Sequence, residues 1–199
     1  MEQPWNEGTG KELDVSEANP GPVRGIAICA GLGGLFLVAY AILMAMKPPG
    51  TVGGSYRESG ALESILFLAG VGLIIATAVG LYWMHRLDLR GSKVVRIASI
   101  TAAISLLMGL GLAGSAFFWL GLAALVVAVL AFAVAGAGLM RSALLPAWSG
   151  ALLIVASLLL LLTNTENEQI LFVIPFGLTW MVLSGLLWLA APSPSSRAA

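Results

Sequence analysis

The chain has 199 residues, of which 59% are hydrophobic and only 10% are charged, whereas a water-soluble domain carries about 25% charged residues. Its ten Lys and Arg residues balance ten Asp and Glu residues, so the net charge gives no indication of a nucleic-acid partner. The single cysteine, Cys29, excludes a disulfide within the chain. This composition predicts a protein whose solvent is the lipid bilayer.

The two ends of the chain are polar and are expected to be disordered tails, 1–22 and 192–199. The first carries five acidic residues against Lys11 alone, and the second is rich in Pro and Ser. Few apolar side chains there offset the entropy of ordering. The first tail also lacks the basic start and short apolar core of a signal peptide, so the first apolar span is expected to remain as an anchor.

Six apolar spans lie between the tails, within residues 23–191, and predict an all-α bundle of six transmembrane helices. About 20 apolar residues suffice to cross the hydrocarbon core of a bilayer. The spans run over residues 24–46, 61–83, 95–113, 116–139, 146–162 and 166–191.

The start of the second span and that of the sixth are typical of helix N-termini. Gly60 is a candidate N-cap, and Glu63 lies in the first turn, where a carboxylate suits the helix dipole. Thr165-x-x-Glu168 matches a capping box. A cation site formed by these two glutamates and Glu166 is the alternative, but capping explains the residues without a ligand.

The third and fourth spans divide a long uncharged run. No charged residue occurs between Arg96 and Arg141, and this run is long enough for two crossings. A glycine-rich stretch followed by three aromatic residues predicts a turn near Gly114 and Ser115, with the aromatic rings at the membrane–water interface. One crossing followed by a re-entrant segment is the alternative.

The positions of the basic residues predict the orientation. With six crossings, one side of the membrane receives eight of the ten Lys and Arg residues, and the other receives only Lys47 and Arg57. Cytoplasmic loops carry an excess of Lys and Arg, so both termini are expected in the cytoplasm. A re-entrant fourth span would move Arg141 and Arg197 to the outside, against this rule.

The loop after the second span is a candidate contact for an anionic lipid headgroup or an acidic partner. Its basic residues are Arg86, Arg90, Lys93 and Arg96, and each contributes about 1 kcal/mol near an anionic surface. A purely topological role explains the same residues, and we favour it. His85 alone makes neither a two-histidine haem site nor a zinc site.

Pro175 lies inside the sixth span and is expected to kink it. Thr179 and Trp180 follow about one turn later, so a kink with a hydroxyl and an indole N–H is a candidate lining for a small-ligand pocket. A simple packing bend is the alternative, because membrane helices tolerate proline. Small residues at four-residue spacing, such as Gly72 and Ala76, predict close helix packing.

Chemically active side chains are missing from the spans. No Asp, Glu, Lys, Arg or His lies deep in any of them, although proton relays and ion-coupled transporters usually keep such residues in the membrane. Catalysis needs a nucleophile, a base or a metal. The sequence therefore predicts no enzymatic activity, no catalytic residue, no metal site and no cofactor.

The segment Leu145-Pro-Ala-Trp-Ser-Gly150 resembles a pattern in small, uncharacterised prokaryotic multi-pass membrane proteins, where Leu-Pro-x-Trp-Ser/Ala-Gly opens a late apolar span. Its physical content is a proline at the first helical position, Pro146, beside an interfacial tryptophan. The resemblance implies a prokaryotic cell (plasma) membrane, and it assigns no activity and no functional residue.

Two functions are consistent with these predictions. The first is a non-enzymatic scaffold, accessory or regulatory subunit that packs in the lipid bilayer against other membrane proteins or copies of itself. The alternative is a carrier or channel for a small neutral or lipid-like solute, which needs no buried charge. A continuous cavity lined by Thr101, Ser105, Thr179 or Trp180 would favour the alternative, and a solid bundle would exclude it.

Overall fold

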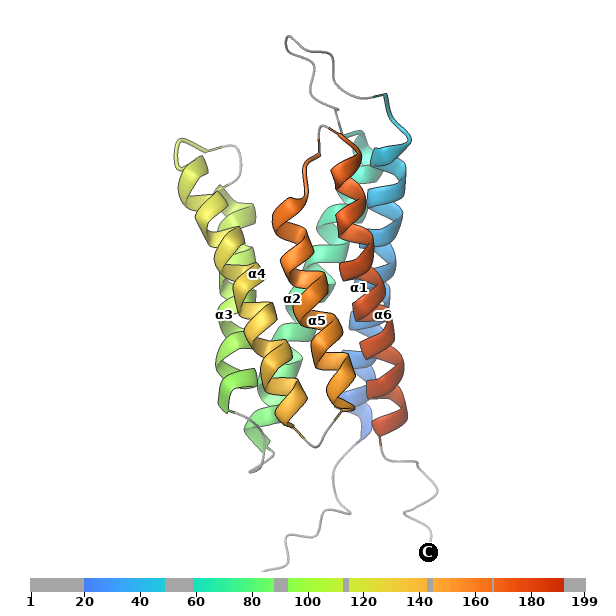
Figure 1. Cartoon of the computed structure of the whole chain (residues 1–199), viewed down its shortest axis with the longest axis vertical. Coiled ribbons are helices and arrows are strands. Elements are labelled where there is room, and N and C mark those ends of the chain that lie inside the picture. Colours follow the sequence, from blue (N-terminus) through green and yellow to red (C-terminus); the bar gives the residue numbers. More distant parts are fainter. Residues whose placement is uncertain are drawn as a thin grey trace, which may run out of the picture.

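The computed structural model describes residues 20–48, 59–87, 93–112, 115–142, 145–165 and 167–191. These form an up-and-down bundle of helices (Figure 1). The α-helices are α1 (Pro20–Ala45), α2 (Ala61–Leu87), α3 (Lys93–Leu112), α4 (Phe118–Arg141), α5 (Ala147–Leu159) and α6 (Val173–Ala190), with the 3₁₀ helices η2 (Leu160–Leu162) and η3 (Glu168–Phe172) between the last two. Each predicted span overlaps one α-helix, the fifth together with η2 and the sixth together with η3. The predicted tails lie outside the described residues, except for residues 20–22, which were expected in the first tail and instead begin α1.

Five of the helices are long and apolar enough to span a membrane, namely α1, α2, α3, α4 and, together with η3, α6. The bundle therefore has the form of an integral membrane protein. The remaining segment, α5 with η2, has 13 α-helical and 3 3₁₀ residues. It extends about 25 Å, slightly less than a hydrocarbon core of about 30 Å.

The uncharged run folds as two antiparallel helices, α3 and α4, which pack against each other. Ser115 closes the turn between them. Its hydroxyl donates to the Leu112 carbonyl oxygen at 2.8 Å and accepts from the Phe117 N–H at 3.1 Å. The aromatic side chains that follow are exposed. The predicted turn is confirmed at Ser115, whereas Gly114 lies outside the described residues.

The six helices close into a ring, because each packs against its neighbours in sequence and α6 returns to α1. Four of these six contacts contain a pair of facing glycines. The pairs are Gly33–Gly70 (α1–α2), Gly34–Gly177 (α1–α6), Gly109–Gly121 (α3–α4) and Gly136–Gly150 (α4–α5). A Cβ on either member would lie 3.3 Å or less from the carbonyl oxygen of the other. Such backbone approach stabilises helix pairs in a membrane, where lipid is as apolar as leucine.

The glycine pairs divide the ring into two units of three helices each. The first unit is α6, α1 and α2, and the second is α3, α4 and α5. In the described part of the chain, no glycine contact joins α2 to α3 or α5 to α6. The first unit is held further by Ser184, whose hydroxyl donates to the Ala27 carbonyl oxygen at 2.6 Å. The units therefore meet through side chains rather than through backbones.

Two helix starts differ from the prediction. Pro146 is the N-cap of α5 rather than its first helical residue. The N-cap before η3 is Asn167, whose side chain accepts from the Gln169 N–H at 2.8 Å. The predicted capping box of Thr165 with Glu168 is wrong, because Glu168 opens a 3₁₀ helix instead of occupying the third position of an α-helix.

Pro175 is the third residue of α6, which begins at Val173 directly after η3. The two segments form one continuous helix, Glu168–Ala190, and the Val173 N–H bonds to the Ile170 carbonyl oxygen of η3. Proline has no N–H with which to continue this pattern, and the change from 3₁₀ to α geometry falls just before it. The kink at Pro175 stays a prediction.

Candidate functional site

A cavity of about 210 Å³ lies between the two units. The first unit contributes Leu37, Phe67, Val71, Ile74, Val173 and Phe176 to its lining, and the second contributes Leu106, Leu125, Ala128, Val129, Phe132, Leu160 and Thr163. The lining therefore comes from α1, α2, α3, α4 and α6, together with η2 and Thr163, which follow α5.

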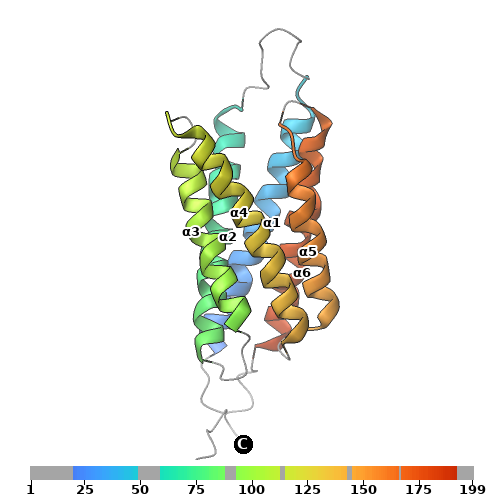
Figure 2. The ribbon, with the colours of Figure 1, turned by 60° about the vertical axis from the view of Figure 1, so that its left-hand side comes forward.

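The tilt of α4 explains where the cavity lies. We call the end of the bundle that carries residues 46–48, 115–117, 163–165 and 167 the outer end, and the opposite end the inner end. Both names follow the orientation that the sequence predicts. Gly121, near the outer start of α4, contacts α3, whereas Gly136, near its inner end, contacts α5. Figure 2 accordingly shows α4 running obliquely from α3 toward α5. Because α4 leaves α5 toward the outer end, space remains there between the units.

The cavity opens toward the outer end and closes toward the middle of the bundle. Lining residues near the outer end, such as Phe67 and Leu160, are half-buried. Those deeper in the bundle, including Ile74, Phe132 and Phe176, are at most 4% exposed. The described lining is thus more exposed near the outer end than deep in the bundle.

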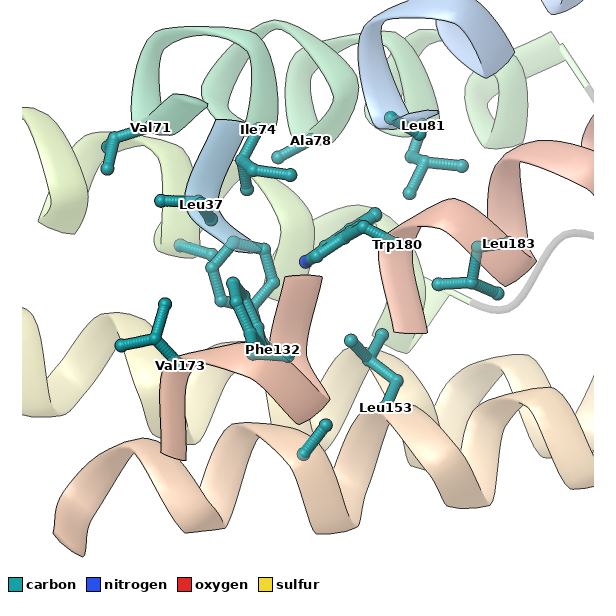
Figure 3. Packing of buried hydrophobic residues seen from close by; sticks show 14 of the residues in the cluster. Leu37, Val71, Ile74, Ala78, Leu81, Phe132, Leu153, Val173, Trp180 and Leu183 are labelled. Carbon is teal, nitrogen blue, oxygen red and sulfur yellow. The ribbon is translucent and has the colours of Figure 1, made fainter. Parts of the chain in front are cut away.

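Three aromatic rings, the aromatic floor, close the cavity. The ring centre of Phe132, on α4, lies 5.6 Å from the ring centre of Phe176 and 5.5 Å from that of Trp180, both on α6. Both pairs are edge to face. Figure 3 shows Phe132 and Trp180 side by side in the core. Edge-to-face contact is favoured between aromatic rings. One ring of the second unit therefore packs against two rings of the first.

Among the residues that the structure describes, the lining of the cavity is almost entirely apolar, with Thr163 as its single polar side chain and no charged residue. An engineered apolar cavity of about 150 Å³ stays dry and binds benzene. The present cavity is larger and equally unsuited to a hydrated ion. Its geometry and chemistry fit a small apolar molecule, or the apolar part of a larger one.

The residues predicted to line a pocket do not line this one. Trp180, 1% exposed, belongs to the aromatic floor. Thr179 donates its hydroxyl to the Pro175 carbonyl oxygen of its own helix at 2.8 Å. Thr101 and Ser105 also lie outside the lining. The structure therefore brings Trp180 to the site and leaves the other candidates apart from it.

Sequence reasoning missed the cavity because its lining consists of ordinary apolar residues on six different segments. Nothing local separates Val71 or Ala128 from other positions in an apolar helix. One signal was available in Phe132, since no other aromatic residue lies between Trp119 and Trp148. An isolated ring among alanines indicates a specific packing partner, which here is Phe176 with Trp180.

Two side chains of the candidate lipid contact, Lys93 and Arg96, are described, and both lie in the first turn of α3. The guanidinium of Arg96 lies 5.8 Å from the ring centre of Tyr82, a cation–π contact that joins α3 to α2. Lys93 is exposed. Arg90 and the side chain of Arg86 lie outside the described residues. The lipid contact therefore stays a prediction.

Glu63, considered for a cation site, forms an ion pair instead. Its carboxylate lies 2.8 Å from the Lys47 Nζ and folds over Gly60, where a Cβ would lie 2.7 Å from it. The Glu63 side chain thus covers the start of α2, and its ion pair with Lys47 links this start to the end of α1. Glu168 is exposed, and Glu166 lies outside the described residues. Among the residues described, no cluster of His, Cys, Asp and Glu is able to hold a metal ion.

The chain matches no protein-family model, no curated protein and no solved structure. Its class is therefore defined by fold and site alone. It is an apolar bundle of six helices, five of them long enough to span a membrane, with an apolar cavity between two three-helix units.

Proposed function

We propose that this protein is a carrier that binds a small neutral, lipid-like solute in the apolar cavity, without enzymatic activity. The proposal rests on the cavity, which opens at the outer end, closes on the aromatic floor and has no charged side chain among its described lining residues. Ligand pockets are typically concave, mostly apolar and equipped with few polar groups. The boundary between the units suits a carrier, because side chains there rotate more easily than glycine-paired backbones separate.

We further propose six crossings of a prokaryotic cell membrane, with both termini in the cytoplasm. The tight Gly136–Gly150 contact packs α5 against α4, and Figure 1 shows α5 running within the bundle beside the longer helices. The start of α1 and the end of α6 lie at the same end. The excess of Lys and Arg at that end assigns it to the cytoplasm.

Cysteine labelling tests this orientation. In a Cys29→Ser background, Ser115→Cys at the outer end is expected to react with a membrane-impermeant maleimide in intact cells. Ser142→Cys, at the end of α4 on the opposite side, is the matched control and should react only after permeabilisation. Labelling of both positions from outside would contradict the proposed topology.

Filling the cavity is expected to abolish solute binding while preserving the fold. Ala128 is fully buried and lines the cavity, so Ala128→Leu places additional carbons in that space. Cavity filling commonly stabilises a protein by about 0.5–2 kcal/mol. Thermal unfolding in lipid nanodiscs measures stability, and quenching of Trp180 fluorescence by a brominated apolar probe measures binding.

Ala123→Leu is the matched control, because Ala123 lies exposed on the same helix and outside the lining. It should bind the probe like the parent protein. If Ala128→Leu also bound the probe with unchanged affinity, the cavity would not be the binding site.

The second candidate function is a scaffold or accessory subunit that contacts other membrane proteins or copies of this chain. The specific observation is on α2, where Gly72 and Ala76 are exposed and a Cβ at Gly72 would meet nothing within 4 Å. Small exposed residues allow another helix to approach closely. Gly72→Leu would remove such a contact but leave solute binding unchanged, which is opposite to the effect expected of Ala128→Leu.

A further inference from the structure

We infer that the solute carries a single neutral hydrogen-bonding group on an apolar body, and that the Thr163 hydroxyl binds this group at the mouth of the cavity. The inference rests on the proposed solute-binding function and specifies its ligand. It assigns Thr163 as the residue that selects a neutral amphiphile, such as an alcohol, over a plain hydrocarbon of the same length.

The backbone places Thr163 at the mouth. The residue directly follows η2, where its N–H bonds to the Leu160 carbonyl oxygen at 3.1 Å and its φ and ψ of −69° and 131° are extended. The helix thus ends at the outer end of the cavity, and the Thr163 side chain belongs to the lining. Its Oγ1 is buried and has no hydrogen-bond partner.

Two other buried hydroxyls, those of Thr77 and Ser157, are satisfied within their own helices. Thr77 and Ser157 each donate to the carbonyl oxygen four residues earlier, at 2.9 Å and 2.6 Å. The extended backbone at Thr163 has left the helical path that makes such bonds. A buried hydroxyl without a partner is unfavourable, and the cavity is the space from which a partner can approach Thr163.

The other polar group near the cavity is also neutral. The Trp180 Nε1 has no hydrogen-bond partner, although the side chain is 1% exposed. In Figure 3 its nitrogen lies on the side of the ring that faces Phe132 and the cavity-lining Leu37 and Val173. Phe132 and Phe176 belong to the lining and Trp180 does not. The deep end of the cavity is therefore aromatic and accepts the apolar part of a ligand.

The size and polarity of the cavity together select the ligand class. Its volume of about 210 Å³ exceeds the cavity of about 150 Å³ that accepts benzene, so a ring with a short chain or a medium alkyl chain fits. A charged head at the mouth would meet no opposite charge among the described lining residues, and an unpaired charge is strongly disfavoured away from water. The tail then points to the aromatic floor and the neutral head to Thr163.

A quenching experiment tests this arrangement. The full chain, with Trp180 as its sole tryptophan and Phe at the other tryptophan positions, is placed in lipid nanodiscs. The probes are a medium-chain alcohol brominated at its tail, the bromoalkane of equal length and the corresponding carboxylate. The bromine quenches Trp180 when the tail reaches the aromatic floor. We expect the alcohol to bind about tenfold more tightly than the bromoalkane, the contribution of one hydrogen bond, and more tightly than the carboxylate.

Variants of Thr163 separate its hydroxyl from its shape. Thr163→Val is expected to weaken binding of the alcohol about tenfold and to leave binding of the bromoalkane unchanged. Thr163→Ser is expected to bind the alcohol as tightly as the parent protein does. Thr77→Val is the matched control, because the Thr77 hydroxyl bonds to its own helix and lies outside the lining.

Four results would each overturn the assignment of Thr163. The alcohol and the bromoalkane could bind equally well, or Thr163→Val could bind the alcohol as tightly as the parent protein. Thr163→Ser could fail to restore binding of the alcohol, or the carboxylate could bind more tightly than the alcohol. A solute-binding cavity would survive all four results, but tighter binding of the carboxylate would also show that the solute is not neutral. Absence of quenching by all probes in the parent protein would instead overturn the proposed function itself.

Discussion

The Gly177→Ala variant is expected to lose about 1–3 kcal/mol of stability, the usual effect of overpacking a tight core, although it adds only one methyl group. The new Cβ would lie 2.6 Å from the Gly34 carbonyl oxygen and 2.7 Å from the Val38 Cγ2. The carbonyl belongs to the backbone of α1, so the two helices must separate. Neighbouring Gly33 contacts α2, and the displacement therefore reaches all three helices of the first unit.

Gly185→Ala is the matched control on the same helix, because a Cβ there meets nothing within 4 Å. It should be neutral or slightly stabilising, since alanine is favoured over glycine in a helix by about 1 kcal/mol. Unfolding of both variants in the same nanodiscs measures the difference. Equal stability would contradict the assignment of Gly34–Gly177 as a tight backbone contact.

Trp180→Ala is expected to be the most destabilising substitution in the aromatic floor, at about 3 kcal/mol. Truncating a large aromatic residue in a soluble core costs about 3–5 kcal/mol, and the lower end applies here because lipid solvates apolar groups as well as the core does. The lost contacts are those with Phe132 and Phe176. Trp180→Phe should cost less, because the Trp180 N–H has no partner.

Thermal unfolding compares Trp180→Ala with Trp148→Ala, whose side chain is 51% exposed. The control should change stability by less than about 0.5 kcal/mol, as surface substitutions usually do. Similar losses in both variants would mean that the aromatic floor does not hold the units together. A selective loss would support the floor as the contact that closes the cavity.

These two predictions test two different sets of contacts in the bundle. Glycine pairs hold the backbones within each unit, whereas the aromatic floor joins one unit to the other. Motion between the units would therefore require rearrangement of three rings and leave the glycine contacts intact. In the proposed carrier, such a rearrangement would admit the solute to the deeper part of the bundle.

Features that depend on residues close together in the sequence were predictable. The turn at Ser115 followed from a glycine-rich stretch before three aromatic residues, and Glu63 was expected in the first turn of α2. Errors arose where two local signals competed. Thr165-x-x-Glu168 matched a capping box, but Asn167 caps a 3₁₀ helix in its place, because its side chain accepts from the Gln169 N–H.

By itself, the sequence determined the apolar class of the protein and the approximate positions of six helices, because composition and span length act locally along the chain. It did not distinguish Gly34 from Gly72, each of which has a small residue four positions away. Only the tertiary structure decided that Gly34 meets the backbone of α6 while Gly72 faces open space. It alone also decided that Thr163 and Phe132 line the same cavity. The physical reason is that close approach and enclosed space are properties of residues far apart in the chain, set by how whole helices tilt and pack.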